Sequence, residues 1–252
     1  LLVFTSIGKV HWLRVFSIPE VSRIAKGKSI ANLLNLQLGE SIASILSVRE
    51  FEEDKFVMVA TERGIVKKTS LMSYSKPRQG GVIGLTIDDG DRLIGAELCD
   101  GESDILLATE KGFSIRFSEK EARPIGRTGR GVRGIRLKTD DRVVGAEIVH
   151  PGNTLLTVTS NGYGKRTQLE EYPVQGRGGL GVMTIRCNEK IGAVVGVQQV
   201  TENDQLLVIT SDGNIVRMKV NEISVIGRNT QGVRLVGTGE SNQVVSVEKL
   251  VE

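Results

Sequence analysis

Residues 105–117 read ILLATEKGFSIRF, and this stretch decides the fold. Residues 105–109 are a short apolar run, Glu110-Lys111-Gly112 can form a turn, and residues 113–117 alternate between apolar and polar side chains. Two such runs on either side of a glycine turn are typical of a β-hairpin, because glycine readily adopts the positive φ that tight turns need. The sequence therefore predicts a hairpin at this point.

The residues that follow complete a unit of about fifty residues. Residues 118–130 are polar and contain Pro124, which favours a loop. Residues 131–137 alternate again, residues 138–141 can turn, and residues 143–149 form a last apolar run. We expect four short antiparallel strands in this unit.

The same unit recurs five times, which predicts one domain over residues 1–252 with repeats at about 1–50, 51–100, 101–150, 151–200 and 201–252. The repeats align on turn glycines at Gly8, Gly64, Gly112, Gly162 and Gly213. Helical periodicity is nearly absent, so the predicted fold class is all-β. Repeated four-stranded sheets of this size favour propeller-like blades in a disc or spiral.

Composition narrows the class of protein further. The two cysteines, Cys99 and Cys187, have no paired spacing, which fits a reducing compartment and predicts a cytoplasmic protein. Apolar runs are too short for a membrane span. The chain starts abruptly inside an apolar strand pattern at Leu1, so we expect it to be a fragment of a longer protein.

Basic residues recur in register with the glycines. Arg23, Arg127, Arg177 and Arg228 each stand four residues before a second glycine, which lies nineteen residues after the turn glycine. Evenly spaced positive charges on loops predict a surface for a long polyanion. The candidate DNA contacts are Arg23, Lys26, Lys28, Lys67, Lys68, Lys76, Arg78, Arg116, Arg127, Arg130, Arg133, Lys165, Arg166, Arg177, Arg217 and Arg228.

The choice of polyanion depends on the aromatic content, which is only 4%. Proteins that bind single strands by stacking need rows of aromatic side chains, so we expect duplex DNA held by its phosphates without base readout. The alternative from another class is a propeller-like module that binds an acidic protein. A third class, a ligand-binding propeller enzyme, would need convergent polar groups that the strands lack.

No catalytic site is predicted in this chain. His11 and His150 are the only histidines, and no cluster of histidine and cysteine has the spacing of a metal site. The acidic pairs Asp88-Asp89 and Asp140-Asp141 fall where hairpin turns are expected, so we interpret them as turn residues. Two G-x-G-x-x-G stretches precede strands and not helices, which argues against a dinucleotide site.

Three stretches carry a family resemblance. Residues 161–167 (NGYGKRT), 132–137 (VRGIRL) and 222–233 (EISVIGRNTQGV) resemble the C-terminal domain of the A protein of bacterial DNA gyrase, a type IIA topoisomerase. The resemblance implies a β-pinwheel, whose propeller-like blades exchange a strand with their neighbours. It also implies that the domain bends or wraps duplex DNA on a basic rim, so that the parent enzyme introduces negative supercoils by ATP-dependent strand passage.

One family motif is not at its usual place. The family has six blades and a Gln-Arg-Arg-Gly-Gly-Lys-Gly box in the first, whereas residues 21–27 read VSRIAKG and residues 175–181 read QGRGGLG. The five repeats therefore resemble blades two to six. The related C-terminal domain of the topoisomerase IV A protein, which selects DNA segments for decatenation, is the alternative within the same class.

The resemblance further implies the partners and the absence of cofactors. Partners would be double-stranded DNA, the breakage-reunion domain of the same polypeptide, and the gyrase B protein in the heterotetramer, with no membrane. The chain itself would need no cofactor, because ATP and magnesium serve other domains of the parent enzyme. It would act as a non-catalytic domain in the cytoplasm of a bacterium.

Overall fold

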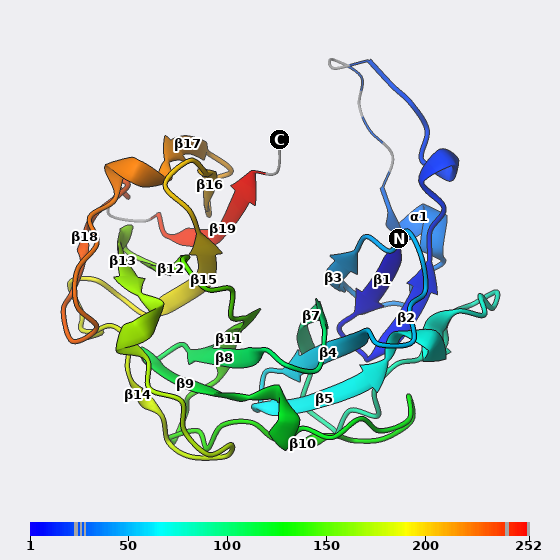
Figure 1. The fold of residues 1–252 in the computed structure, drawn as a ribbon. Coiled ribbons are helices and arrows are strands. Elements are labelled where there is room, and N and C mark those ends of the chain that lie inside the picture. Colours follow the sequence, from blue (N-terminus) through cyan, green and yellow to red (C-terminus); the bar gives the residue numbers. More distant parts are fainter. Residues whose placement is uncertain (23–24, 26, 28, 240–241, 251–252) are drawn as a thin grey trace. The chain divides into compact units, whose positions relative to one another are not determined.

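A computed structural model describes residues 1–252 except 23–24, 26, 28, 240–241 and 251–252 (Figure 1). As predicted, the described residues form β-strands joined by turns and loops, and their helices are limited to short 3₁₀ turns and one α-helix of four residues. Each repeat starts with a hairpin. Its first strands are β1 (Leu2–Thr5), β4 (Phe56–Thr61), β8 (Asp104–Thr109), β12 (Thr154–Thr159) and β16 (Gln205–Thr210). Its return strands are β2 (Lys9–Trp12), β5 (Ile65–Ser70), β9 (Phe113–Ser118), β13 (Tyr163–Gln168) and β17 (Ile215–Lys219).

The remaining elements also recur from repeat to repeat. Single 3₁₀ turns follow four return strands, as η2 (Leu71–Tyr74), η3 (Glu119–Glu121), η4 (Leu169–Glu171) and η5 (Val220–Glu222). Two-residue strands come next, as β6 (Val82–Ile83), β10 (Val132–Arg133), β14 (Val182–Met183) and β18 (Val233–Arg234). Long strands close the repeats, as β3 (Ile42–Leu46), β7 (Leu93–Cys99), β11 (Val143–Ile148), β15 (Val194–Val200) and β19 (Val244–Leu250). The first repeat instead carries η1 (Val15–Ser17) and α1 (Ala31–Leu34).

The predicted hairpin is confirmed in detail. Leu106 of β8 lies opposite Arg116 of β9 in an antiparallel ladder. Gly112 in the turn between them has a φ of 81°. A side chain there would also collide with the backbone, because its Cβ would lie 2.3 Å from the carbonyl oxygen of Ile185. The turn glycine is thus required both by its own conformation and by its neighbour.

The short strands do not belong to the sheet of their own repeat. Val182 of β14 pairs with Ser114 of β9, and Val233 of β18 pairs with Gly164 of β13. The sheet orders are β3-β1-β2-β6, β10-β5-β4-β7, β11-β8-β9-β14, β15-β12-β13-β18 and β17-β16-β19. Four sheets are therefore completed by a strand from the next repeat, as the family resemblance implies (Figure 1).

The observed sheets correct three sequence expectations. A repeat does not contain its own four-stranded blade, because its third strand pairs with the preceding repeat. That strand is also shorter than expected, since only two of residues 131–137 form a ladder. The last sheet has three strands instead of four, because no described residues supply a strand to the free side of β17.

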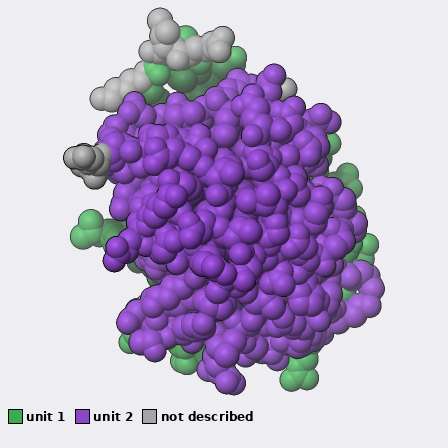
Figure 2. All heavy atoms as spheres, turned by 90° about the vertical axis from the view of Figure 1, so that its left-hand side faces the viewer, with its two compact units in different colours: residues 1–101, 122–132 green, residues 102–121, 133–252 purple. Residues whose placement is uncertain are grey.

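The chain divides into two compact units, which Figure 2 colours separately. Unit 1 comprises residues 1–101 and 122–132, and unit 2 comprises residues 102–121 and 133–252. Residues 122–132 belong to the third repeat by sequence but to unit 1 by contact, because they lie along β5. The amide of Ile125, for example, donates to the carbonyl of Lys68 at 2.9 Å. Strand exchange therefore shifts the structural boundary into the third repeat.

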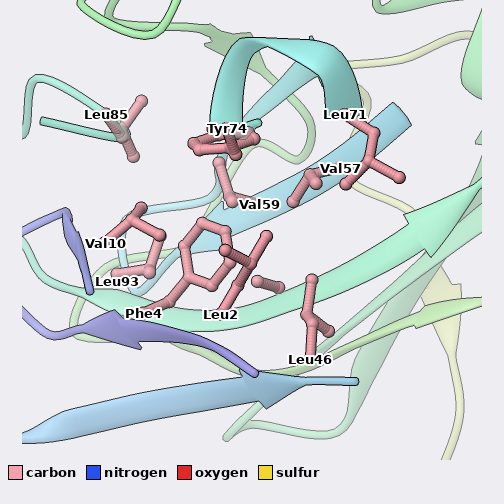
Figure 3. Packing of buried hydrophobic residues seen from close by; sticks show 11 residues of the cluster. Leu2, Phe4, Val10, Leu46, Val57, Val59, Leu71, Tyr74, Leu85 and Leu93 are labelled. Atoms are coloured by element: carbon pink, nitrogen blue, oxygen red, sulfur yellow. The ribbon is translucent and has the colours of Figure 1, made fainter. Parts of the chain in front are cut away.

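The cores lie between successive sheets within each unit. In unit 1, Leu2, Phe4 and Val10 of the first sheet pack with Val59 and Tyr74 of the second repeat (Figure 3). The rings of Phe4 and Tyr74 meet edge to face, with centroids 5.7 Å apart. In unit 2, similar clusters join the third repeat to the fourth and the fourth to the fifth. Within each unit, neighbouring repeats thus bury one another's apolar faces, which stabilises that unit.

The acidic pairs are turn residues, as predicted. Asp140 has a φ of 52°, a conformation that Asp tolerates in turns. The carboxylate of Asp141 accepts hydrogen bonds from Thr109 Oγ1 at 2.8 Å and from the amides of Lys111 and Arg142 at 3.0 and 2.9 Å. Asp141 thereby ties the closing strand to the hairpin turn.

Candidate nucleic-acid interface

The loops that carry the recurring arginines lie against the return strands of the preceding repeats. We call residues 76–81, 123–131, 173–181 and 224–232 the register loops. Each ends in a glycine of positive φ that abuts a backbone carbonyl. A Cβ on Gly131 would lie 2.5 Å from Val66 O, and one on Gly181 would lie 2.2 Å from Ser114 O. The second glycine of the sequence pattern is therefore the point where a loop crosses onto its neighbour.

The recurring arginines make the same contact in three repeats. In each, Nη1 donates to the carbonyl of the second residue of the two-residue strand in the preceding repeat. The pairs are Arg127 with Ile83 at 3.3 Å, Arg177 with Arg133 at 2.6 Å, and Arg228 with Met183 at 3.0 Å. These arginines therefore link consecutive repeats, in addition to any contact that they make with a ligand.

Burial distinguishes these arginines from ordinary surface charges. Arg127, Arg177 and Arg228 are half-buried, and the Nε atoms of Arg177 and Arg228 are enclosed by protein. The guanidinium of Arg228 also lies over the ring of Tyr172, 5.9 Å from its centroid. One edge of each guanidinium thus contacts the protein, so these three side chains are partly fixed in place and are not fully solvated.

Two predicted DNA contacts, Lys67 and Lys165, are buried lysines whose ammonium groups donate hydrogen bonds to the carbonyls of a register loop. Lys67 Nζ donates to the carbonyl of Arg127 at 2.5 Å, to that of Gly126 at 3.3 Å, and to that of Gly84. Burial, together with the charge of Arg127, lowers the pKa of Lys67 to about 8. Because the side chain is only 1% exposed, it is not available to a phosphate.

Lys165 repeats this arrangement in unit 2. Its Nζ donates to the carbonyl of Gly227 at 2.5 Å, to that of Arg228, and to Thr230 Oγ1 at 3.1 Å. Burial lowers the pKa of Lys165 to about 8, with the Glu171 carboxylate opposing and the Arg228 charge reinforcing the shift. Lys67 and Lys165 are therefore removed from the set of proposed phosphate contacts.

Three further predicted contacts are also engaged with protein groups. Arg166 is buried and donates to the carbonyl of Ile223 at 2.8 Å and to Glu202 at 2.7 Å. Arg116 is half-buried, pairs with Asp104 at 2.9 Å, and donates to the carbonyl of Leu169 at 2.9 Å. Lys68 is buried beside the ring of Phe56. Because protein groups already engage their side chains, we do not place Lys68, Arg116 and Arg166 among the proposed DNA contacts.

The remaining predicted residues fall into two groups. Arg23, Lys26 and Lys28 lie outside the described residues. The side chains on the surface are Lys76, Arg78, Arg130, Arg133 and Arg217. Arg130 pairs with Asp88 at 2.7 Å, although both groups are largely exposed, and Arg217 donates to Gln205 at 2.6 Å. Such exposed pairs are weak, so phosphate can compete for these arginines.

Sequence reasoning missed three exposed arginines beside the register loops. The backbone amides of Arg136 and Arg186 bind the register loop of the following repeat, at Gly179 O and Thr230 O. Their side chains are exposed, as is that of Arg234, which lies over the ring of Tyr163 at 5.4 Å. Arg136 and Arg186 both stand twenty-four residues after their turn glycine. That shared offset is the signal that could have found them.

The described residues include both histidines and both cysteines of the chain. They contain no group of three or more histidine, cysteine, aspartate or glutamate side chains able to hold a metal ion. His11 is buried, with Nε2 at 3.6 Å from Glu40 Oε1. Among the helices that the structure describes, none has the length and apolarity to cross a membrane.

Repeated sheets that exchange a short strand, with arginines on the exchanging loops, define a β-pinwheel type of repeat protein. The sequence profile described as "DNA gyrase C-terminal domain, beta-propeller" matches residues 1–49, 55–100, 103–150, 153–201 and 204–250. The chain therefore belongs to the DNA gyrase C-terminal domain family.

Relatives of known name agree with this assignment. The chain is 47% identical over 252 residues to the DNA gyrase A protein of Salmonella typhimurium and 53% identical to that of Buchnera aphidicola from Acyrthosiphon pisum. It is covered completely in both matches and spans 29% and 30% of the length of these relatives.

Two solved structures are similar to the whole chain. The C-terminal domain of DNA topoisomerase IV matches with a TM-score of 0.90 and 26% identity, over 99% of this chain and 78% of that one. A DNA gyrase A C-terminal domain matches with a TM-score of 0.86 and 24% identity, over 99% and 82%. The latter likeness supports the fold.

Proposed function

We propose that this chain binds duplex DNA through its register loops and the exposed arginines beside them, without sequence specificity. The single observation that carries the proposal is the repetition of these loops, each crossing the return strand before it and each flanked by exposed arginine. Guanidinium groups that recur from repeat to repeat suit the phosphate backbone, which presents about one charge per 1.7 Å of duplex.

We further propose that the bound DNA is bent or wrapped, and that the chain is the non-catalytic DNA-wrapping domain of a bacterial DNA gyrase. The breakage-reunion domain and the gyrase B protein would then be its partners in the cytoplasm. ATP and magnesium would serve those other parts of the enzyme. The likeness to a topoisomerase IV domain favours a second candidate, DNA selection for decatenation. The named sequence relatives favour gyrase.

Binding is tested by fluorescence anisotropy with duplexes of about 20 bp and of several times that length. If about eight phosphates are neutralised, log K should fall with log salt at a slope of about −7. Bending a site of 20–30 bp by 40–90° costs about 1–6 kcal/mol, which several charge contacts can offset. Wrapping would be contradicted if both duplexes bound with equal affinity and fluorescence transfer between labels on the two DNA ends showed that the ends do not come closer.

The choice between the two topoisomerases is tested with plasmid. Relaxed plasmid is incubated with the chain and resealed, and the change in linking number is measured. A shift in one direction supports the gyrase assignment. DNA binding without a change in linking number favours the topoisomerase IV assignment. If the chain does not bind DNA but binds an acidic protein, the interaction module is supported.

A further inference from the structure

Lys67 and Lys165 occupy the same position of their repeats, three residues after the turn glycine. Each places its ammonium group under the register loop of the next repeat, where it contacts two consecutive carbonyls. In both cases one of these is the carbonyl of the recurring arginine itself. Among the residues that the structure describes, the arrangement occurs once in each unit, so it is a repeated feature of the chain.

The recurring arginines that these lysines hold are fixed at two points. The carbonyl of Arg228 accepts from Lys165, and its guanidinium donates to the carbonyl of Met183 at 3.0 Å. Arg127 is held in the same way between Lys67 and Ile83. A side chain whose backbone and head are both anchored loses less conformational freedom when it binds a ligand, and preorganisation of this kind raises affinity.

The third repeat provides a natural comparison. Ile115 stands at the lysine position there, and its side chain is buried. The register loop beside it is held by a backbone hydrogen bond from Gln175 N to Arg116 O at 2.8 Å, and the same bond occurs beside the two lysines, from Ile125 N to Lys68 O and from Ile226 N to Arg166 O, both at 2.9 Å. A buried cation is therefore not needed to complete this sheet. The two lysines therefore have a role other than completing the sheet.

We infer that Lys67 and Lys165 are positioning residues for DNA binding, whose ammonium groups fix the backbone of the loops that present Arg127 and Arg228 to phosphate. The inference rests on the proposed function, because it names how that same surface is held. It assigns to the lysines no phosphate contact of their own.

The test is a double-mutant cycle with duplex DNA, using Lys165→Met, Arg228→Ala and the combined variant. Lys165→Met should lower the magnitude of the salt slope by about one unit, as loss of the Arg228 phosphate contact would. The combined variant should show little further loss, because the lysine acts through the arginine. Additive losses would overturn the inference.

Two control variants separate positioning from general damage. Lys165→Met combined with Arg177→Ala should be additive, because a different loop carries Arg177. Ile115→Met, at the matched position without a cation, should leave the salt slope unchanged. If Ile115→Met lowers the slope as much as Lys165→Met does, the effect is one of packing and the inference fails.

A measurement without DNA keeps the two proposals distinguishable. In Lys165→Met, the amides of Ile226 and Thr230 should exchange at least about tenfold faster, since they lie in the loop that has lost its charged donor. The amide of Gln175 should not change. Unchanged exchange at Ile226 and Thr230 would overturn the inference. Faster exchange in a protein that does not bind DNA would instead refute the proposed function alone.

Thr230→Val is the second variant, for the case in which Lys165→Met does not fold. It removes the hydroxyl that accepts from Lys165 at 3.1 Å and donates to the carbonyl of Gly227 at 3.0 Å, and it keeps the charge of the lysine. We expect the same direction of change in amide exchange and in the salt slope, with a smaller magnitude. No change in either would count against the inference.

Discussion

The ammonium nitrogen of Lys165 lies 2.5 Å from the carbonyl oxygen of Gly227, 62 residues further along the chain. The ammonium nitrogen of Lys67 likewise lies 2.5 Å from a carbonyl oxygen of the next repeat, that of Arg127, across 60 residues. A basic side chain in one repeat therefore holds a loop that belongs to the next. The positive charges of this chain serve two purposes, because some stabilise the exchange between repeats and others remain at the surface.

The buried lysines predict a dependence of stability on pH. Their folded-state pKa of about 8 lies below the ordinary value of 10.5, because burial disfavours the charged form. Between pH 8 and 10.5 the unfolded chain binds more protons than the folded chain, so stability should rise with pH across this window. Urea unfolding at about pH 7.5 and about pH 9.5 measures the rise.

The charged groups that face the two lysines set the control for this measurement. Arg127 faces Lys67, and Glu171 and Arg228 face Lys165, and replacing the two lysines leaves these three residues unchanged. The rise should therefore be reduced in the double variant Lys67→Met, Lys165→Met. An equal rise in that variant would mean that other groups cause it.

Exposed and half-buried arginines should respond differently to substitution. Arg177→Ala removes the hydrogen bond to Arg133 O and should lower the free energy of unfolding by about 0.5–1.5 kcal/mol. Arg136→Ala, at an exposed position, should change it by less than about 0.5 kcal/mol. Both should lower the salt slope of DNA binding by about one unit. Unchanged stability in Arg177→Ala would show that the inter-repeat contact contributes nothing.

The glycine that ends a register loop should not tolerate a side chain. Gly181→Ala combines a φ of 72° with a Cβ only 2.2 Å from Ser114 O, so we expect a loss of about 1–3 kcal/mol in unfolding free energy. Gly176→Ala in the same loop is the matched control, because its Cβ would meet nothing within 4 Å. Denaturant titration measures the unfolding free energy of both variants. An equal, small loss in the two would contradict the close approach of Gly181 to Ser114 O.

Substitution of Asp141 should affect folding and not DNA binding. Asp141→Ala removes the acceptor for Thr109 and for the amides of Lys111 and Arg142, which should lower stability by about 1–3 kcal/mol. The folded variant should keep its affinity for duplex DNA, since the carboxylate faces the turn. A clear change in the salt slope would indicate that this turn also lies near the bound DNA.

The sequence predicts where the loops begin and end but not which charges reach the surface. The offset between Gly112 and Gly131 identifies the loop, because both glycines are required by backbone geometry. Lys67 and Lys68 are both predicted as DNA contacts from their place in the repeat, although strand alternation puts adjacent side chains on opposite faces. Both faces of β5 are covered, so both lysines are buried.

Strand exchange itself could not be derived from periodicity. Val182 and Met183 have the alternation of any strand, and nothing in two residues specifies that the partner is Ser114, 68 positions earlier. Only the family resemblance implied the exchange. The contact of Arg177 with Arg133 O is hidden for the same reason, because it depends on that pairing.

The exchange also means that the repeat seen in the sequence and the sheet seen in the structure have different boundaries. A duplicated segment of about fifty residues brings three long strands for its own sheet and supplies the fourth, with its arginine-bearing loop, to the copy before it. The third sheet thus needs residues 104–183, and a cut at residue 150 would leave β9 without β14. Each of the first four sheets therefore depends on the repeat that follows it for its fourth strand.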